Sequence, residues 1–274
     1  MADIVPHTVP ERIIGDGPVL LDVEGAVATI TLNRPDVSNG MNLDMMKALV
    51  AAAMRCHGDP RIAVVHLRGA GASFCAGGDV REFASKGEGL GDFLREVTAW
   101  LQIAVGTLVR LNAVVVTEVQ GYAAGGGGLG LVCASDIVVA GGSAKFMAGA
   151  TRVGMAPDGG ASVILPRLVG FRRATEIFLS NRIVPAVEAL AIGLVTEVVP
   201  DEELPARARA LALRYAEGAP KAMAAAKRLL WNGIGVEACL PEEARTVSEL
   251  SATADAREGL AAVIERRKPV FRGC

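Results

Sequence analysis

Two glycine-rich segments are the parts of this 274-residue chain best suited to chemistry. The first, Phe-Cys-Ala-Gly-Gly-Asp at residues 74–79, follows an apolar segment, and the second contains four consecutive glycines at 125–128 before the expected start of a helix. Glycine adopts positive φ without strain and lets a ligand approach the backbone closely. Peptide N–H groups at a helix start also lack intrahelical partners, so they can point at a bound group.

Two such turns facing each other would form an oxyanion hole, in which neutral N–H donors stabilise charge developing on a carbonyl oxygen. A single glycine more often serves only the close packing of a strand against a helix. A run of four at a helix start costs backbone entropy, which favours a functional interpretation of the run.

Gly125, Gly127 and Gly130 formally match the dinucleotide-binding fingerprint. The next apolar segment, however, ends in Ala-Gly-Gly with no acidic residue for a ribose, and the run lies in the middle of the chain. We therefore interpret this match as accidental and expect no dinucleotide cofactor.

Nucleophilic and metal chemistries find little support in the sequence. It has no Gly-x-Ser-x-Gly motif. Its three histidines, His7, His57 and His66, lack the spacing of metal ligands and are interpreted as structural or exposed groups. We expect no metal.

Charge and hydropathy exclude further classes. With 28 basic against 30 acidic residues and no basic stripe, nucleic acid is not an expected partner. Apolar residues make up 51% of the chain but form short runs, so no membrane association is expected, and their excess indicates subunit interfaces. No signal peptide is visible, which predicts a cytoplasmic location. Five scattered cysteines are predicted to be small, reduced core residues: Cys56, Cys75, Cys133, Cys239 and Cys274.

Strands alternating with helices are predicted around the two turns. Residues 19–23 and 26–32 predict a hairpin, and Asn42 is expected to cap a helix that Gly58-Asp59-Pro60 stops. Further strands are predicted at 62–67, 113–119, 137–140 and 144–147, with a helix over 90–111. This order predicts an α/β fold with parallel pairing.

After Pro200 the pattern becomes helical, at residues 202–217, 220–231 and 241–267, with no convincing strand. We therefore predict a core over residues 1–200 and a C-terminal helical region over residues 201–274.

Several motifs occur in a fixed order along the chain. They are Thr-Leu-Asn-Arg-Pro at 31–35, Phe-Cys-Ala-Gly-Gly-Asp at 74–79, Gly-Tyr-Ala-Ala-Gly-Gly-Gly-Gly at 121–128, Ala-Lys-Phe at 144–146, Pro-Asp-Gly-Gly at 157–160, Leu-Pro-Arg-Leu-Val-Gly at 165–170, Gly-Leu-Val at 193–195, Val-Val-Pro at 198–200 and Arg-Lys-Pro-Val-Phe at 267–271. As a set they resemble the crotonase, or enoyl-CoA hydratase/isomerase, superfamily over nearly the whole chain.

The resemblance implies a crotonase-like spiral of ββα units, with the C-terminal helices used for trimerisation and often a dimer of trimers. It implies an acyl-CoA or enoyl-CoA thioester as substrate, with coenzyme A as part of that substrate and no other cofactor. The N–H groups of Gly78 and Gly127 would form the oxyanion hole. The other residues expected at the acyl-CoA site are Arg34, Ala76, Asp79 and Gly126. By themselves, Asp79 is also interpreted as a helix cap and Arg34 as an exposed side chain.

The chain departs from the family's hydratases at two positions. Where these carry glutamates that activate water, this chain has Gly130 and Ala150. Asp158 is the remaining acid in the region, and its position resembles that of the proton-carrying acid of several isomerases. The alternative for Asp158 is a helix N-cap. Burial among Met155, Ala156, Val163 and Ile164 is expected to raise its pKa.

The expected activity is therefore isomerisation of a Δ3 to a Δ2 double bond, with Asp158 moving the proton between two carbons. Two alternatives remain open. One is hydration, or another reaction of the superfamily, by a different acid and base. The other is an acyl-CoA-binding protein without catalysis.

Overall fold

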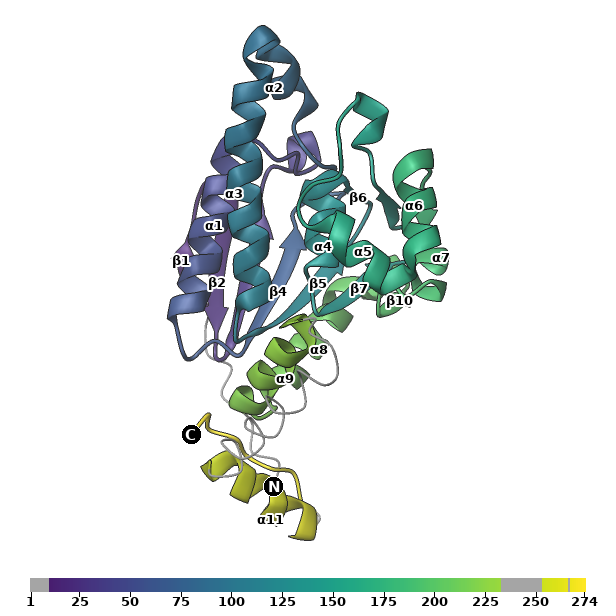
Figure 1. Cartoon of the computed structure of the whole chain (residues 1–274). Coiled ribbons are helices and arrows are strands. Elements are labelled where there is room, and N and C mark those ends of the chain that lie inside the picture. Colours follow the sequence, from purple (N-terminus) through teal and green to yellow (C-terminus); the bar gives the residue numbers. More distant parts are fainter. Residues whose placement is uncertain (1–9, 233–252, 266) are drawn as a thin grey trace.

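The computed structural model describes residues 10–232, 253–265 and 267–274. Its centre is a seven-stranded sheet in the order β1-β2-β3-β4-β5-β7-β10 (Figure 1). Its strands are β1 (Glu11–Ile14), β2 (Val19–Glu24), β3 (Val27–Leu32), β4 (Val64–Gly69), β5 (Val114–Val119), β7 (Ile137–Gly141) and β10 (Glu197–Val199). The first three strands pair antiparallel, and every pair from β3 to β10 is parallel. The predicted α/β fold with parallel pairing is confirmed.

Local sequence signals explain the elements that open the fold. β2 and β3 form the predicted hairpin, which turns at Gly25 with a φ of 57° that favours glycine. α1 (Leu43–Gly58) begins at Asn42, whose side chain accepts a hydrogen bond from Met45 N at 3.0 Å. The predicted cap is therefore confirmed.

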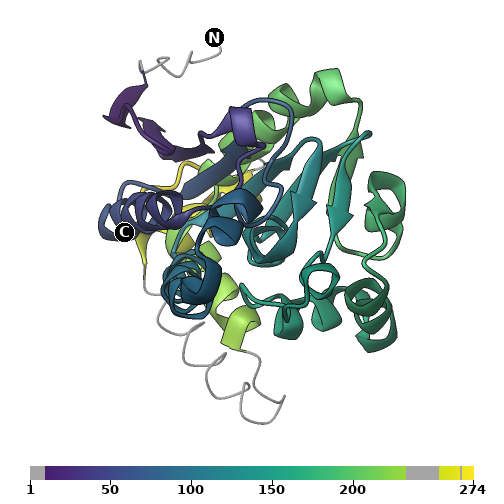
Figure 2. The same ribbon diagram turned by 90° about the horizontal axis from the view of Figure 1, so that it is seen from above.

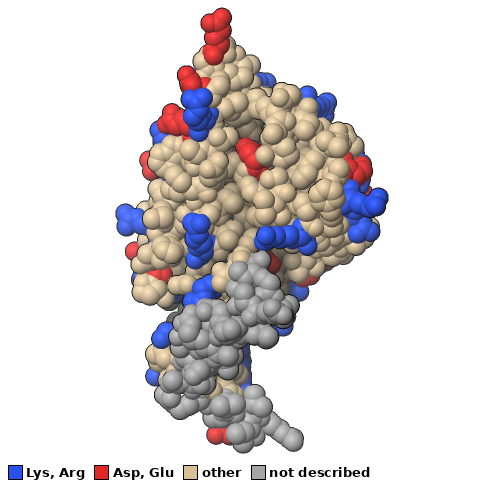
Figure 3. All heavy atoms as spheres, viewed as in Figure 1, with Lys and Arg blue, Asp and Glu red and all other residues tan. Residues whose placement is uncertain are grey.

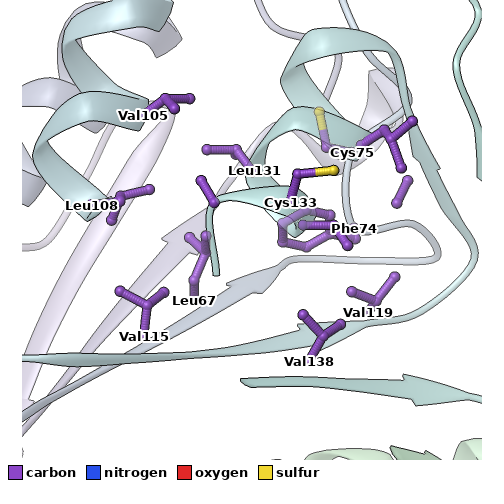
Figure 4. Packing of buried hydrophobic residues seen from close by; sticks show 14 of the residues in the cluster. Leu67, Phe74, Cys75, Val105, Leu108, Val115, Val119, Leu131, Cys133 and Val138 are labelled. Carbon is purple, nitrogen blue, oxygen red and sulfur yellow. The ribbon is translucent and has the colours of Figure 1, made fainter. Parts of the chain in front are cut away.

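The main core lies between the sheet and the two long helices α1 and α3 (Leu90–Arg110), which cover one face of the sheet (Figure 1). Alternate residues of a strand point to opposite faces. Leu67 of β4 and Val115 of β5 thus meet Val105 and Leu108 of α3 on the covered face (Figure 4).

α8 (Leu204–Ala216) covers the opposite face of the sheet. Its residues Leu204 and Ala208 are buried with Val64, the β4 residue whose side chain points away from α3. α8 therefore belongs to the packed core, although it follows Pro200. The predicted division at residues 200 and 201 stays a prediction, as does trimerisation through the helices beyond it.

A second, three-stranded sheet contains β6 (Tyr122–Ala124), β8 (Lys145–Met147) and β9 (Val184–Pro185). The helices α5 (Ala161–Val169), α6 (Phe171–Ser180) and α7 (Ala186–Ala191) lie on the side of the molecule away from the β2–β3 hairpin (Figure 2). β8 was predicted from the sequence, whereas β1, β6, β9 and β10 and the helices α6 and α7 were not.

The described chain beyond Pro200 contains helices and no strand, as predicted: α8, α9 (Pro220–Asn232) and α11 (Ala254–Glu265). Of the helix predicted over 241–267, residues 241–252 and 266 lie outside the described residues. Among the described helices, none combines the length and apolar character that crossing a bilayer requires.

The cysteines only partly match their prediction. Cys56, Cys75 and Cys133 are buried free thiols, as expected of small core residues. Cys274 is exposed, so its assignment to the core was wrong; it ends the chain, where no apolar layer covers it. Cys239 lies outside the described residues.

A buried ion pair ties α9 to the sheet. Lys227 Nζ lies 2.7 Å from Asp136 Oδ2, and it also donates to two backbone carbonyls near the α3–β5 connection at 3.0 and 2.9 Å. Asp136 further accepts from Val115 N at 2.8 Å and from the indole N–H of Trp231 at 2.9 Å. Asp136 is therefore a structural acid, remote from proton transfer.

We predict that Lys227→Met lowers the free energy of unfolding by about 3 kcal/mol, because it leaves the Asp136 carboxylate without its cation in a largely buried place. Urea denaturation measures the change. Lys221→Met, at an exposed position of the same helix, is the control and should stay within about 0.5 kcal/mol of the parent. Equal stabilities of the two variants would contradict a structural role for this pair.

Candidate active site

The first glycine turn is held by a short parallel bridge to the segment before α1. Met41 N donates to Gly77 O at 2.8 Å, and Asp79 N donates to Met41 O at 2.9 Å. Successive peptide groups of an extended strand alternate in direction, so the N–H of Gly78 points away from Met41. Within the described chain it forms no backbone hydrogen bond, which leaves it available to a ligand.

Arg34 and Asp79 brace this turn. The Arg34 guanidinium donates to the Gly40 carbonyl and lies 3.0 Å from Asp79 Oδ2, while Asp79 Oδ1 accepts from Glu82 N at 3.2 Å. The cap predicted for Asp79 on α2 (Val80–Ser85) is thus confirmed. Burial by itself raises the pKa of Asp79, but N–H donors of α2 and the Arg34 guanidinium outweigh it and hold that pKa below its ordinary value.

Asn39 holds the loop around the first glycine turn in place, and the sequence motifs did not identify it. Its fully buried side chain donates to Ala70 O and Ser73 O at 2.9 and 2.8 Å and accepts from Arg34 N at 2.8 Å. Asn39 has a φ of 55°, a conformation that asparagine tolerates better than most residues. The Asn-Gly pair at 39–40 was the available signal, since this dipeptide marks such turns.

The second glycine turn lies beside the first. Cys75 N donates to Tyr122 O and Ala124 N donates to Cys75 O, both at 2.9 Å, which aligns the first turn with β6. A β-carbon added to Gly125 would lie 3.4 Å from the Cα of Gly77. The structure therefore brings together the two turns that the sequence singled out.

A helix begins directly after Gly125, which has a φ of 60° and a ψ of −171°. It opens with the π-helical turn η3 (Gly126–Gly130) and continues as α4 (Leu131–Cys133). The first N–H groups of a helix have no intrahelical partner, and that of Gly127 is one of them. A β-carbon at Gly127 would lie 2.9 Å from the sulfur of Met41, so that side chain would have to shift to admit one.

Asp158 lies against this glycine run. A β-carbon added to Gly126 would overlap Oδ1 of Asp158 and would lie 2.9 Å from its Oδ2. The residue preceding α5 at its cap position is Gly160, and α5 has no side-chain cap. The N-cap interpretation of Asp158 is therefore wrong, because the carboxylate points at Gly126 instead.

Burial raises the pKa of Asp158, and the peptide N–H groups of Asp158 itself and of Gly126 oppose this rise without cancelling it. The direction matches the prediction, but the expected surroundings are partly wrong. Ala156 is exposed and Val163 is 57% exposed, so these two side chains do not bury Asp158. The glycine run shields its carboxylate from solvent instead.

The two positions that bear glutamate in hydratases are occupied differently here. A β-carbon at Gly130 would lie 3.0 Å from Gly159 O, so the backbone beside Asp158 fills the space that a longer side chain would need. Ala150 is half-buried and precedes the short helix η4 (Thr151–Val153).

The remaining predicted residues have no contact with Asp158 among the described interactions. Ala76 is exposed, and its N–H is used by Ser38 O at 2.9 Å. His66 is buried with Glu118 at 3.1 Å, and it points to the sheet face opposite Leu67, as a structural histidine would. Charged side chains are sparse across the middle of the face seen in Figure 3. Among the described residues, no group of three His, Cys, Asp or Glu side chains is placed to hold a metal.

Comparison with known proteins agrees with this arrangement. The family model described as "Enoyl-CoA hydratase/isomerase" matches residues 22–274. A relative from Rhodobacter capsulatus named "Probable enoyl-CoA hydratase" is 39% identical over 254 residues, covering 92% of this chain and 96% of the relative. "Probable enoyl-CoA hydratase EchA12" of Mycobacterium tuberculosis is 38% identical over 261 residues, covering 89% of each. The crystal structure of an enoyl-CoA hydratase from Bacillus anthracis has a TM-score of 0.89 at 30% identity and covers 94% of this chain and 100% of that one.

The ordered motifs, the α/β fold and the paired glycine turns thus agree with both kinds of comparison, and the chain belongs to the enoyl-CoA hydratase/isomerase family.

Proposed function

We propose that this family member isomerises a 3-enoyl-CoA thioester to the conjugated 2-enoyl-CoA, with Asp158 as the proton carrier. The observation that carries the proposal is the contact of the Asp158 carboxylate with Gly126, the residue next to Gly127. This contact puts a partly buried base beside one of the two N–H donors proposed to hold the thioester carbonyl.

In the proposed reaction, the Asp158 carboxylate removes a proton from C2. The electron pair of that C–H bond moves toward the thioester, and negative charge develops on its oxygen, where the N–H groups of Gly78 and Gly127 stabilise it. The same carboxyl group then returns the proton to C4, which shifts the double bond. The donors stabilise the dienolate more than the neutral thioester, and this difference accelerates the reaction.

Hydration is the second candidate, and the names of the relatives favour it. Addition of water requires groups that hold and deprotonate the water molecule. At the two positions where hydratases of the family carry glutamate, this chain has Gly130 and Ala150. The space beside Gly130 is filled by Gly159. These replacements favour isomerisation, in which no water is consumed. The same replacements keep open a third candidate, an acyl-CoA-binding protein without turnover.

We further propose a homotrimer or a dimer of trimers in the cytoplasm, with coenzyme A bound only as part of the substrate. Large apolar side chains on α6 and α7 support self-association, since Phe171 is 77%, Leu179 71% and Val187 72% exposed. These helices precede the region 201–274, to which the family resemblance assigns trimerisation.

We predict that Asp158→Asn lowers kcat/KM for conversion of a 3-enoyl-CoA to its conjugated isomer by about 10²- to 10⁴-fold, the usual contribution of a positioned acid or base. The change is followed by absorbance of the conjugated thioester, while calorimetry should find acyl-CoA binding unchanged. Asp92→Asn, on an exposed carboxylate of α3, is the control and should keep full activity. Full isomerase activity of Asp158→Asn would remove Asp158 as the base, and rapid hydration of crotonyl-CoA would favour the second candidate.

The pH dependence offers a separate prediction. The base must be ionised, so activity falls as the pH drops through the pKa of Asp158. Burial raises that pKa, so the acidic limb of kcat/KM should lie above the value of about 3.9 for an ordinary aspartate. Asp158→Glu should retain an acidic limb, whereas the residual activity of Asp158→Asn should lack it. A limb that is unchanged in the asparagine variant would belong to another group.

A further inference from the structure

We infer that Gly126 is a positioning residue for Asp158, because its missing side chain leaves the space that the Asp158 carboxylate occupies. The inference rests on the proposed function, in which Asp158 carries the proton. It gives Gly126 a role different from the acyl-CoA contact that the sequence predicted.

The glycines of the run are required for different reasons. A β-carbon at Gly128 would lie 2.8 Å from the carbonyl carbon of Ala123, and one at Gly127 would lie 2.9 Å from the sulfur of Met41. At Gly126, in contrast, the three nearest atoms all belong to the Asp158 carboxylate. Gly126 is also not among the glycines with positive φ, so its backbone conformation is open to alanine. At Gly126 the atoms nearest to an added methyl group are therefore those of the Asp158 carboxylate, and the backbone conformation of Gly126 does not itself exclude alanine.

The backbone around Asp158 fixes the carboxylate from the other side. Gly159 and Gly160 have φ values of 59° and 75°, and a β-carbon at Gly159 would lie 2.7 Å from Gly126 O. The backbone after Asp158 thus lies close against the peptide of Gly126. A methyl group at 126 would instead rotate the Asp158 side chain out of its place, because a side chain moves more easily than this packed backbone.

Charge gives the contact a second consequence. Burial raises the pKa of Asp158, and the N–H of Gly126 acts against this rise. The two adjacent amides would then have different partners. The N–H of Gly126 faces the Asp158 carboxylate, and the N–H of Gly127 remains available to the thioester oxygen. A carboxylate held this way has a defined orientation, and errors of about 1 Å in such placement can cost about 10²-fold in rate.

A double-mutant cycle tests the inference, with kcat/KM for 3-enoyl-CoA isomerisation measured in the parent, Gly126→Ala, Asp158→Asn and the double variant. We expect Gly126→Ala to lose about 10- to 10²-fold and to lose nothing further when Asp158 is already asparagine. Its acyl-CoA affinity should be unchanged and the acidic limb of its pH profile displaced. Gly106→Ala is the matched control, because a β-carbon there meets only the Arg110 side chain at an ordinary 3.5 Å.

Two outcomes would overturn the role of Gly126. Full activity of Gly126→Ala beside an inactive Asp158→Asn refutes the positioning role and leaves the proposed function intact. An equal loss in both backgrounds, with weakened acyl-CoA binding, assigns the Gly126 amide to the thioester instead. Full activity of Asp158→Asn refutes the proposed function and the inference together.

Stability gives a readout that does not depend on turnover. If Gly126→Ala lowers the melting temperature, adding Asp158→Ala should restore it, because the overlapping carboxylate atoms are then gone. Failure to recover would place the clash elsewhere and overturn the inference.

Discussion

Two backbone hydrogen bonds, from Cys75 N to Tyr122 O and from Ala124 N to Cys75 O, are the interaction on which the site depends. β4 and β5 are parallel neighbours, so the segments that follow them leave the sheet at the same edge. The two bonds prolong this pairing beyond the sheet and bring Gly77 against Gly125. Without them, the two glycine turns would have no fixed spacing, and the oxyanion hole proposed for Gly78 and Gly127 would lose its geometry. Pre-organised donors are effective only when that spacing exists before the substrate arrives.

The same closeness explains why the second turn tolerates so much glycine. Each added glycine increases the entropy lost on folding, so the run needs compensating reasons. Gly125 supplies a left-handed φ, Gly128 allows β6 to lie directly on the helix, and Gly130 admits the backbone of Gly159. The glycines from 125 to 130 therefore combine one backbone conformation and two packing requirements with the space for one carboxylate.

The sequence was sufficient for features that depend on local signals. The Asn42 cap, the hairpin at Gly25 and the apolar strands β4 and β5 each follow from a few neighbouring residues, and the parallel order follows from their alternation with helices. β9 and β10 contain only two and three residues, too few for any periodicity, and they form because neighbouring strands offer partners. Asp158 shows the limit of local reasoning, because Asp followed by two glycines is also a common turn. Its contact with Gly126 joins segments distant in sequence, and only the folded chain reveals it.

The distribution of carboxylates around the glycine run bears directly on the choice of reaction. Two carboxylates that share a small site repel each other and split their pKa values. Burial raises the pKa of Asp158, and no acidic side chain among the described residues contributes to the shift. In the proposed role of Asp158 as base, burial acts against the N–H groups of Asp158 itself and of Gly126, and one group governs the proton balance. A single acid–base group suits isomerisation, in which the proton removed from one carbon is returned to another. It suits hydration less, because one group must activate water while another protonates carbon. The raised pKa of Asp158 also lies closer to neutral pH than that of an ordinary aspartate. A pKa near the working pH lets a group accept and return a proton efficiently.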